Sequence, residues 1–257
     1  MRMPVRVWTV DETLLAFRLY CTTPFGRIHT GNTDIQALAQ VLQRSPDAVA
    51  MKMLNLASHD PRVIERGKVG LQNASKRDAE VWSKFHAHVS DLFWASEEAL
   101  KRIKQGHASP TLFTDFKAFQ GATEVVRESP VRRAQSFFRE TVLTAYGHTC
   151  AVSGIDKPEL LIASHIIPWA KAVDRRADPC NGLALSALHD RAFDRGLITV
   201  DDALSLVISP RLKTKQPNPV IRTAILEFEG KQLSKAERFA PDPQALAYHR
   251  ERIFLAG

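Results

Sequence analysis

The chain has 257 residues, 44% hydrophobic and 25% charged, an ordinary composition for a soluble globular protein with room for two small domains. Its formal net charge of +7 favours a polyanionic partner. Three scattered cysteines argue against a disulfide framework, and no apolar run is long enough for a signal peptide or a membrane span. We therefore expect a cytoplasmic protein with no membrane partner.

The first part of the chain, to about residue 104, is predicted to be mainly helical because its apolar residues recur at helical spacing. Breaks are expected at residues 106–110 and at Gly121. We place a domain boundary after the second break. Residues 1–125 are then a helical, DNA-binding domain, and residues 126–257 are a second domain.

Two short helices joined by a tight turn are predicted between residues 32 and 58. The first starts with a capping-box pattern, in which Thr33 is the cap and Gln36 answers it. The second starts at Ser45, which is followed by Pro46 at the first helical position. Two helices joined in this way are what a helix-turn-helix requires.

The exposed face of the second helix is expected to carry Asn55, with Lys52 at its side. If this helix enters a major groove, Asn55 would read a base edge and Lys52 would contact a phosphate. The alternative is an ordinary pair of amphipathic helices without DNA contact, since such pairs are common and this one is not especially basic.

The second domain begins with a helix that extends to Tyr146, after which the pattern changes to short strands. The strand predicted at residues 160–167 carries His165. After a polar loop, Asn181 precedes a shorter strand, and Ser186 can cap a following helix. The predicted core unit is therefore strand, loop, strand and helix, and the fold class is α+β.

This unit brings together a base, an orienting amide and potential metal ligands. Taken alone, His165 in an apolar strand would more often be a buried histidine bonded to a backbone carbonyl. The neighbouring Asn181 and the helix motif reverse that preference, and the set as a whole suits metal-assisted hydrolysis of a phosphodiester. The candidate site residues are His165, Asn181, His189, Asp190 and Asp194.

Three segments carry a family resemblance: Ser-His165-Ile-Ile-Pro-Trp, Asn181-Gly-Leu and Leu-His189-Asp-Arg-Ala-Phe-Asp194-Arg-Gly. They resemble the HNH endonuclease superfamily with its ββα-metal fold, and most closely a branch found among restriction endonucleases. The likeness covers most of the chain, but only the segment from His165 to Gly196 is specific. It implies a helical module that positions double-stranded DNA and an HNH domain that cuts it by single-metal hydrolysis.

The resemblance also implies roles for the site residues. His165 would be the general base, and Asn181 would hold the loop or the His165 ring in place. The metal ligands would be His189 or Asp190, between which the spacing does not decide, together with Asp194 one turn beyond Asp190. Mg²⁺ is the expected ion, with Mn²⁺, Ni²⁺ or Zn²⁺ also compatible with nitrogen and oxygen ligands. The structural alternative for Asp194 is an ion pair with a neighbouring arginine.

One departure concerns Ser164, because many relatives place a metal-binding aspartate or histidine at this position. In the loop between the strands, Arg175 and Arg176 would contact phosphates beside the cut, although a surface-charge role is as plausible for either. The resemblance alone implies restriction-type defence, and it allows a homodimer because many restriction enzymes cut both strands as dimers. The rival functions are a DNA-binding regulator with a degenerate nuclease centre, and a nuclease effector acting on RNA or without sequence preference.

Overall fold

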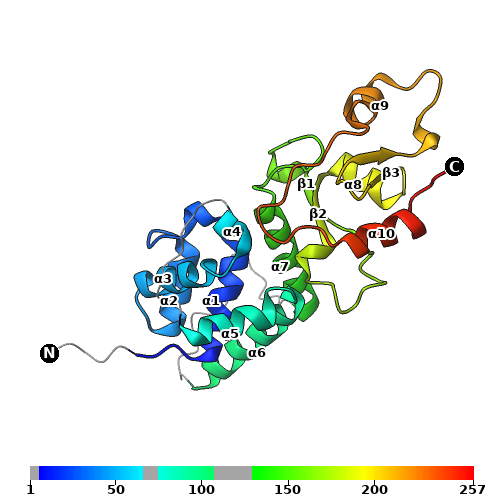
Figure 1. Cartoon of the computed structure of the whole chain (residues 1–257). Coiled ribbons are helices and arrows are strands. Elements are labelled where there is room, and N and C mark those ends of the chain that lie inside the picture. Colours follow the sequence, from blue (N-terminus) through cyan, green and yellow to red (C-terminus); the bar gives the residue numbers. More distant parts are fainter. Residues whose placement is uncertain (1–5, 66–74, 107–128) are drawn as a thin grey trace, which may run out of the picture. The chain divides into compact units, whose positions relative to one another are not determined.

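The computed structural model of the chain describes residues 6–65, 75–106 and 129–257. The chain divides into two compact units, residues 1–132 and 133–257, which we describe separately (Figure 1). The predicted boundary at residue 125, the break at Gly121 and most of the loop predicted at residues 106–110 lie outside the described residues. Within the described residues, no helix combines the length and the apolar character needed to cross a membrane.

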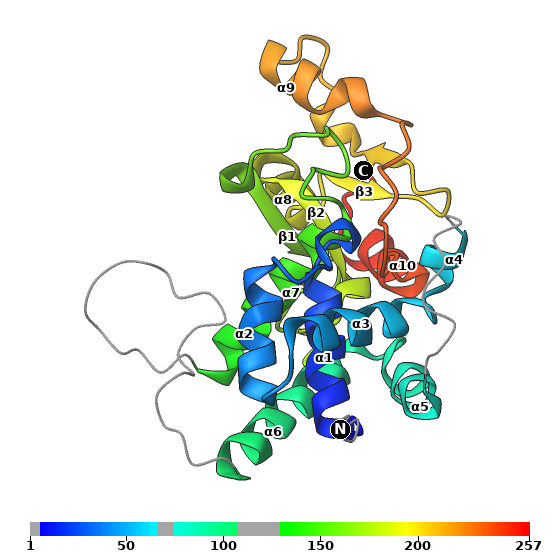
Figure 2. The same ribbon diagram turned by 90° about the vertical axis from the view of Figure 1, so that its left-hand side faces the viewer.

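The first unit is helical and is organised around its first helix, α1 (Figure 2). Helices α2, α3, α5 and α6 all contact α1. Helix α1 buries Phe17 and Tyr20 completely, and Phe17 stacks on Trp82 of α5 with ring centroids 4.9 Å apart. The helices are α1 (Val10–Thr22), α2 (Thr33–Leu42), α3 (Pro46–Ala57), α4 (Pro61–Glu65), α5 (Lys76–Phe85) and α6 (Val89–Gly106).

The predicted helix pair is present as α2 and α3, but its first cap differs from the prediction. Asn32 caps α2, and its side-chain oxygen accepts hydrogen bonds from the backbone N–H groups of Asp34 and Ile35. Thr33 is already the first helical residue. Asparagine is at least as good a cap as threonine, so the helix begins one residue earlier than its capping-box pattern suggested. Ser45 caps α3 as predicted.

The second unit combines helices with two small antiparallel hairpins (Figure 1). One hairpin pairs β1 with β2, and the other pairs β3 with β4. This confirms a mixed fold of helices and small sheets in the C-terminal part of the chain. The elements are α7 (Pro130–Ala145), β1 (Leu161–His165), β2 (Gly182–Ser186), α8 (Ala187–Asp194), β3 (Ile198–Val200), β4 (Leu206–Ile208), α9 (Pro219–Ala224) and α10 (Pro243–Arg252).

Helix α7 packs closely against the first hairpin at Gly182, which pairs with His165 across the two strands. A Cβ atom at position 182 would lie 2.5 Å from Cγ2 of Val142 and 2.9 Å from Cζ of Phe138. Only glycine fits at that distance, so the contact brings the ring of Phe138 against the end of β1. The local fold of this hairpin thus determines the surroundings of His165.

Helix α8 follows β2 directly and contacts both strands of the hairpin. Its capping residue is Ser186, and Phe193 is buried in the core together with Leu183 and Leu185 of β2. Gly196 ends the helix with φ of +66°, and a Cβ atom there would lie 2.1 Å from the carbonyl oxygen of Ile253. The predicted strand, loop, strand and helix are therefore all present, and Gly196 closes the helix.

Candidate active site around His165

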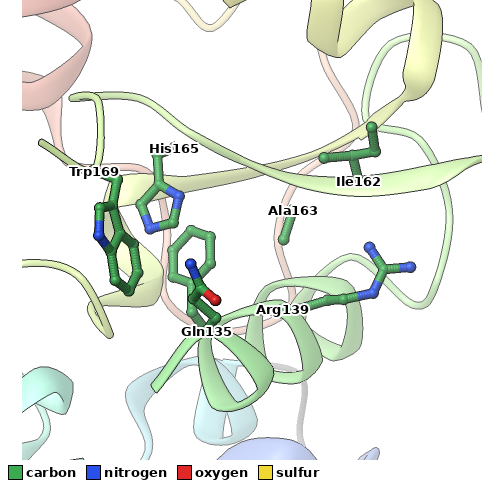
Figure 3. Close-up of a pocket in the computed structure, with 7 residues that line it drawn as sticks. Gln135, Arg139, Ile162, Ala163, His165 and Trp169 are labelled. Carbon is green, nitrogen blue, oxygen red and sulfur yellow. The ribbon is translucent and has the colours of Figure 1, made fainter. Parts of the chain in front are cut away.

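His165 is the last residue of β1, and its half-buried ring lies between two aromatic side chains (Figure 3). The ring stacks on Phe138 of α7 with a centroid distance of 3.7 Å and an interplanar angle of 12°. Trp169, in the loop after β1, meets the same ring edge-on at 5.4 Å. These contacts restrict the imidazole to one orientation.

One nitrogen of this ring is committed to a backbone carbonyl. Nε2 of His165 lies 3.2 Å from the carbonyl oxygen of Arg176, and a carbonyl can only accept, so Nε2 carries the proton and donates. In the neutral imidazole, Nδ1 then holds a lone pair. Within the described part of the chain, Nδ1 has no hydrogen-bond partner, and it is therefore the nitrogen that can take up a proton.

The charge state of His165 follows from its surroundings. Burial lowers the pKa of the imidazole, and the hydrogen bond to Arg176 and the charge of Asp178 only partly offset this effect. The net result is a pKa below the ordinary value of 6.5, so the ring is neutral at neutral pH. A neutral imidazole with a fixed tautomer is the form that a general base requires.

A cavity of about 290 Å³ opens beside His165, between α7 and the β1 strand (Figure 3). Gln135 and Arg139 project into it from successive turns of α7. None of the described residues that line the cavity is acidic, so this lining would not repel a phosphodiester. The lining residues are Gln135, Phe138, Arg139, Ile162, Ala163, His165 and Trp169.

Asn181 is fully buried and holds the loop that follows β1. Its side-chain amide donates to the carbonyl oxygen of Ile167 at 3.1 Å and accepts from the N–H of the same residue at 2.8 Å. Its backbone carbonyl accepts from the N–H of Ile166. Of the two contacts considered for Asn181, the structure shows the loop contact, and the His165 ring is held by other groups.

His189 lies in a different environment, with only 2% of its surface exposed. Its Nδ1 is 2.8 Å from Oγ of Ser186 and 3.6 Å from Sγ of Cys150, and its Nε2 is 2.8 Å from the carbonyl oxygen of Ala224. Both ring nitrogens are therefore engaged within the protein. The side chains of His165 and His189 share no hydrogen-bond or ring partner among the described residues, so the structure does not bring them together.

The buried thiol beside His189 is electrostatically unusual. Burial raises the pKa of Cys150, but hydrogen bonds from His189 and Ser153 outweigh this and lower it to about 6. Hydrogen bonds to the sulfur of this kind stabilise the thiolate form of the cysteine. The contact between Cys150 and His189 joins segments 39 residues apart, so sequence patterns did not reveal it.

The two aspartates of α8 are closer to solvent than His189. Asp194 is exposed, and Asp190 is half-buried. Partial desolvation of the Asp194 carboxyl, together with the charge of Asp190, raises the pKa of Asp194. Their interaction is consistent with the predicted one-turn spacing on a common helical face.

The residues predicted to bind a metal do not fit one as a set. Among the described residues, no three His, Cys, Asp or Glu side chains lie close enough to hold an ion. The two nitrogens of His189 are saturated by protein groups. Ser164, at the position where relatives place a ligand, has a buried hydroxyl without a hydrogen-bond partner among the described residues, and a neutral hydroxyl is a weak ligand.

The two arginines of the loop between β1 and β2 differ in whether their guanidinium groups form ion pairs. Arg175 forms ion pairs with Asp178 at 2.8 Å and Asp242 at 2.7 Å, which tie the loop to the start of α10. Arg176 lies over the Trp169 ring at 4.9 Å and donates only its Nε to the carbonyl oxygen of that residue. Among the described residues, the terminal nitrogens of Arg176 have no hydrogen-bond partner, whereas both terminal nitrogens of Arg175 are engaged in ion pairs.

In the first unit, Lys52 does not lie where the DNA-contact prediction requires. Its side chain is 5% exposed, and Nζ donates to the buried Asp78 at 2.6 Å. Its burial removes Lys52 from the helix surface, so we withdraw the predicted phosphate contact. Asn55 is half-buried, and its side-chain oxygen has no hydrogen-bond partner among the described residues.

The sequence pointed to His165 but not to Gln135 and Phe138, which form the other wall of the cavity. Their signal was present as the amphipathic spacing of α7, on which Phe138 lies on the buried face and Gln135 on the exposed one. The sequence does not indicate which element covers this helix; in the structure, the hairpin packs against it at Gly182.

In a comparison with known protein families, residues 150–201 fit the family model described as HNH endonuclease. The matched segment contains β1, β2, α8 and β3, and therefore His165, Asn181 and His189. No curated protein matches the chain.

Proposed function

We propose that this chain is an endonuclease that hydrolyses phosphodiester bonds in double-stranded DNA, because residues 150–201 match the HNH endonuclease family model. The observation that carries the proposal is the state of His165. Its tautomer is set by the Arg176 carbonyl, its pKa is lowered by burial, and its Nδ1 is free within the described part of the chain.

In the proposed reaction, Nδ1 of His165 takes a proton from a water molecule as the water oxygen bonds to phosphorus. The bond from phosphorus to the 3′ oxygen breaks, and the leaving oxygen receives a proton from solvent. The imidazolium that forms is stabilised because Nε2 continues to donate to the Arg176 carbonyl. The ring stack on Phe138 keeps Nδ1 directed at the substrate throughout.

Two further residues support this step without exchanging protons. Asn181 fixes the backbone after β1 through Ile167, and so positions the base indirectly. We assign Arg176 to the phosphate, since its guanidinium lies over Trp169 next to the base and keeps its terminal nitrogens unbonded in the described structure.

Divalent-metal dependence is part of the proposal, because HNH nucleases typically use such an ion. Mg²⁺ is the first ion to test, followed by Mn²⁺, Ni²⁺ and Zn²⁺. Since the predicted ligands do not fit an ion as a set, we derive no catalytic step through it. The same misfit favours a second candidate function, a DNA-binding regulator with a degenerate nuclease centre.

The experiment that separates these functions is a plasmid cleavage assay on purified protein, with and without each ion. We expect cleavage by the wild type and none by His165→Ala. A matched control is His88→Ala, which removes an exposed histidine of the first unit. Failure of the wild type to cleave in every ion would overturn the nuclease proposal and favour the regulator.

The fragment pattern addresses the proposed biological role. Discrete bands from plasmid DNA, which modification of the DNA abolishes, would support restriction-type defence. A smear, or preferential cleavage of RNA, would instead support a non-specific nuclease effector. Sedimentation of the protein with and without duplex DNA would test whether a homodimer forms.

A further inference from the structure

We infer that the cavity beside His165 binds one unstacked nucleobase of the nucleotide that flanks the cut, and that Gln135 reads its edge. The inference rests on the proposed function, because it places the scissile phosphate at His165. The cavity shares a wall with His165, so a group that enters it is within one nucleotide of the reacting phosphorus.

The form of the cavity suits a flat heterocycle. Its volume of about 290 Å³ is at the small end of the range for small-molecule sites. Its walls combine the aromatic rings of Phe138 and Trp169 with the aliphatic side chains of Ile162 and Ala163 (Figure 3). Apolar and aromatic walls of this kind accept the face of a base, which is released from its stack when it leaves the duplex.

The polar groups of the cavity suit a base edge better than a phosphate. Two terminal nitrogens of Arg139 already donate to the carbonyl oxygens of Leu161 and Pro158, so this guanidinium is held in the wall. In the described structure, the amide of Gln135 makes no hydrogen bond. An amide offers a donor and an acceptor side by side, which matches a base edge, whereas a phosphate offers acceptors only.

Gln135 is also placed where it can act without disturbing the catalytic group. It is exposed on α7, one turn before Phe138, whose ring supports His165. Replacing the amide with an aliphatic group therefore leaves the stack on His165 unchanged. This separation predicts that Gln135 affects which sites are cut, while His165 affects whether any site is cut.

The test begins with the cut positions mapped on plasmid DNA, and then compares wild type with Gln135→Leu. We expect the wild type to favour one base next to the cut, and Gln135→Leu to lose about 10- to 100-fold of that preference. Ser136→Ala, an exposed neighbour on α7 outside the cavity, is the matched control and should keep it.

Two altered substrates test the unstacked base directly. An abasic site at the flanking position should slow cleavage by the wild type about 10- to 100-fold. It should change the rate of Gln135→Leu much less, because that variant has already lost the contact to the base. A mismatch opposite that base lowers the cost of unstacking and should speed cleavage. The inference would be overturned if Gln135→Leu lost rate equally at all sites, or if neither substrate changed the cleavage rate. Cleavage by the wild type would still support the proposed function in either case.

Discussion

Two histidines of one motif lie in opposite environments. His165 lies beside a cavity, and His189 lies in a buried cluster. His165 is half-buried and keeps one ring nitrogen free in the described structure. His189 is 2% exposed, and three side-chain or backbone groups engage its two nitrogens. Chemistry needs an available lone pair, whereas a saturated ring contributes to stability. We therefore propose that His165 acts in catalysis and that His189 contributes to the core.

The most direct test of these two roles is to replace each histidine in turn. His165→Ala should reduce kcat by about 10²- to 10⁴-fold, the range for loss of a general base. Its free energy of unfolding should fall by only about 1 kcal/mol, the value of the stack on Phe138. Single-turnover cleavage and urea denaturation measure the two effects, and an active His165→Ala would remove the base from the proposal.

His189→Ala is expected to show the reverse pattern. It leaves the Ala224 carbonyl without its side-chain donor and removes one of the two partners of Ser186 Oγ, which should lower the free energy of unfolding by about 2–4 kcal/mol. His189→Gln, which can retain one of these hydrogen bonds, should recover part of that loss. If His189→Ala were as stable as the wild type but bound metal ions more weakly by calorimetry, His189 would be a ligand after all.

Asn181→Ala should give an intermediate result. It leaves the N–H and carbonyl of Ile167 without their side-chain partner, at a cost of about 1–3 kcal/mol of unfolding free energy. Because the freed loop no longer fixes the end of β1, kcat should also fall. Asn181→Asp retains the acceptor only, so a rate between those of Asn181→Ala and wild type is the expected control result.

The pH profile should change by less than the effects of these substitutions. His165 must be neutral to accept a proton, so kcat/KM should rise with pH and then level off. Burial lowers the pKa of this imidazole, so the half-maximal point should lie below 6.5. Replacing Trp169 with alanine hydrates the ring and should move the midpoint upward. A wild-type midpoint above 6.5 would contradict the described environment.

Removal of divalent ions tests separately whether an ion serves catalysis near His165 or stabilises the fold near His189. Dialysis against a chelator should abolish cleavage without changing the unfolding midpoint, and Mg²⁺ or Mn²⁺ should restore activity. If instead the midpoint dropped on chelation, an ion would be part of the fold near α8. The Asp194→Asn variant, at an exposed position, would then be the matched probe.

Local pattern was sufficient to predict much of this fold. The strand that carries His165, the helix capped by Ser186 and the glycine that closes it all follow from spacing and capping preferences. The family resemblance, carried by His165, Asn181 and His189, is confirmed by the match over residues 150–201. These features depend on residues that are near one another in the chain.

The features that the sequence did not reveal are contacts between distant segments. Lys52 was placed beside an exposed face, but α5 supplies Asp78, 26 residues away, as its buried partner. His189 was interpreted as a ligand, but the carbonyl that engages it belongs to Ala224, 35 residues away. Helical periodicity cannot reveal such partners, because it reports which face is apolar and not which element will cover it.

The glycine at position 182 limits how this chain can change. A single methyl group there would collide with Val142 and Phe138, so every other amino acid would separate α7 from the hairpin. In a library of all single substitutions selected for cleavage, position 182 should be depleted as completely as position 165, although Gly182 is buried and carries no side chain. Compensation would require a simultaneous reduction in the size of Val142 or Phe138, and the latter would leave the imidazole without its support.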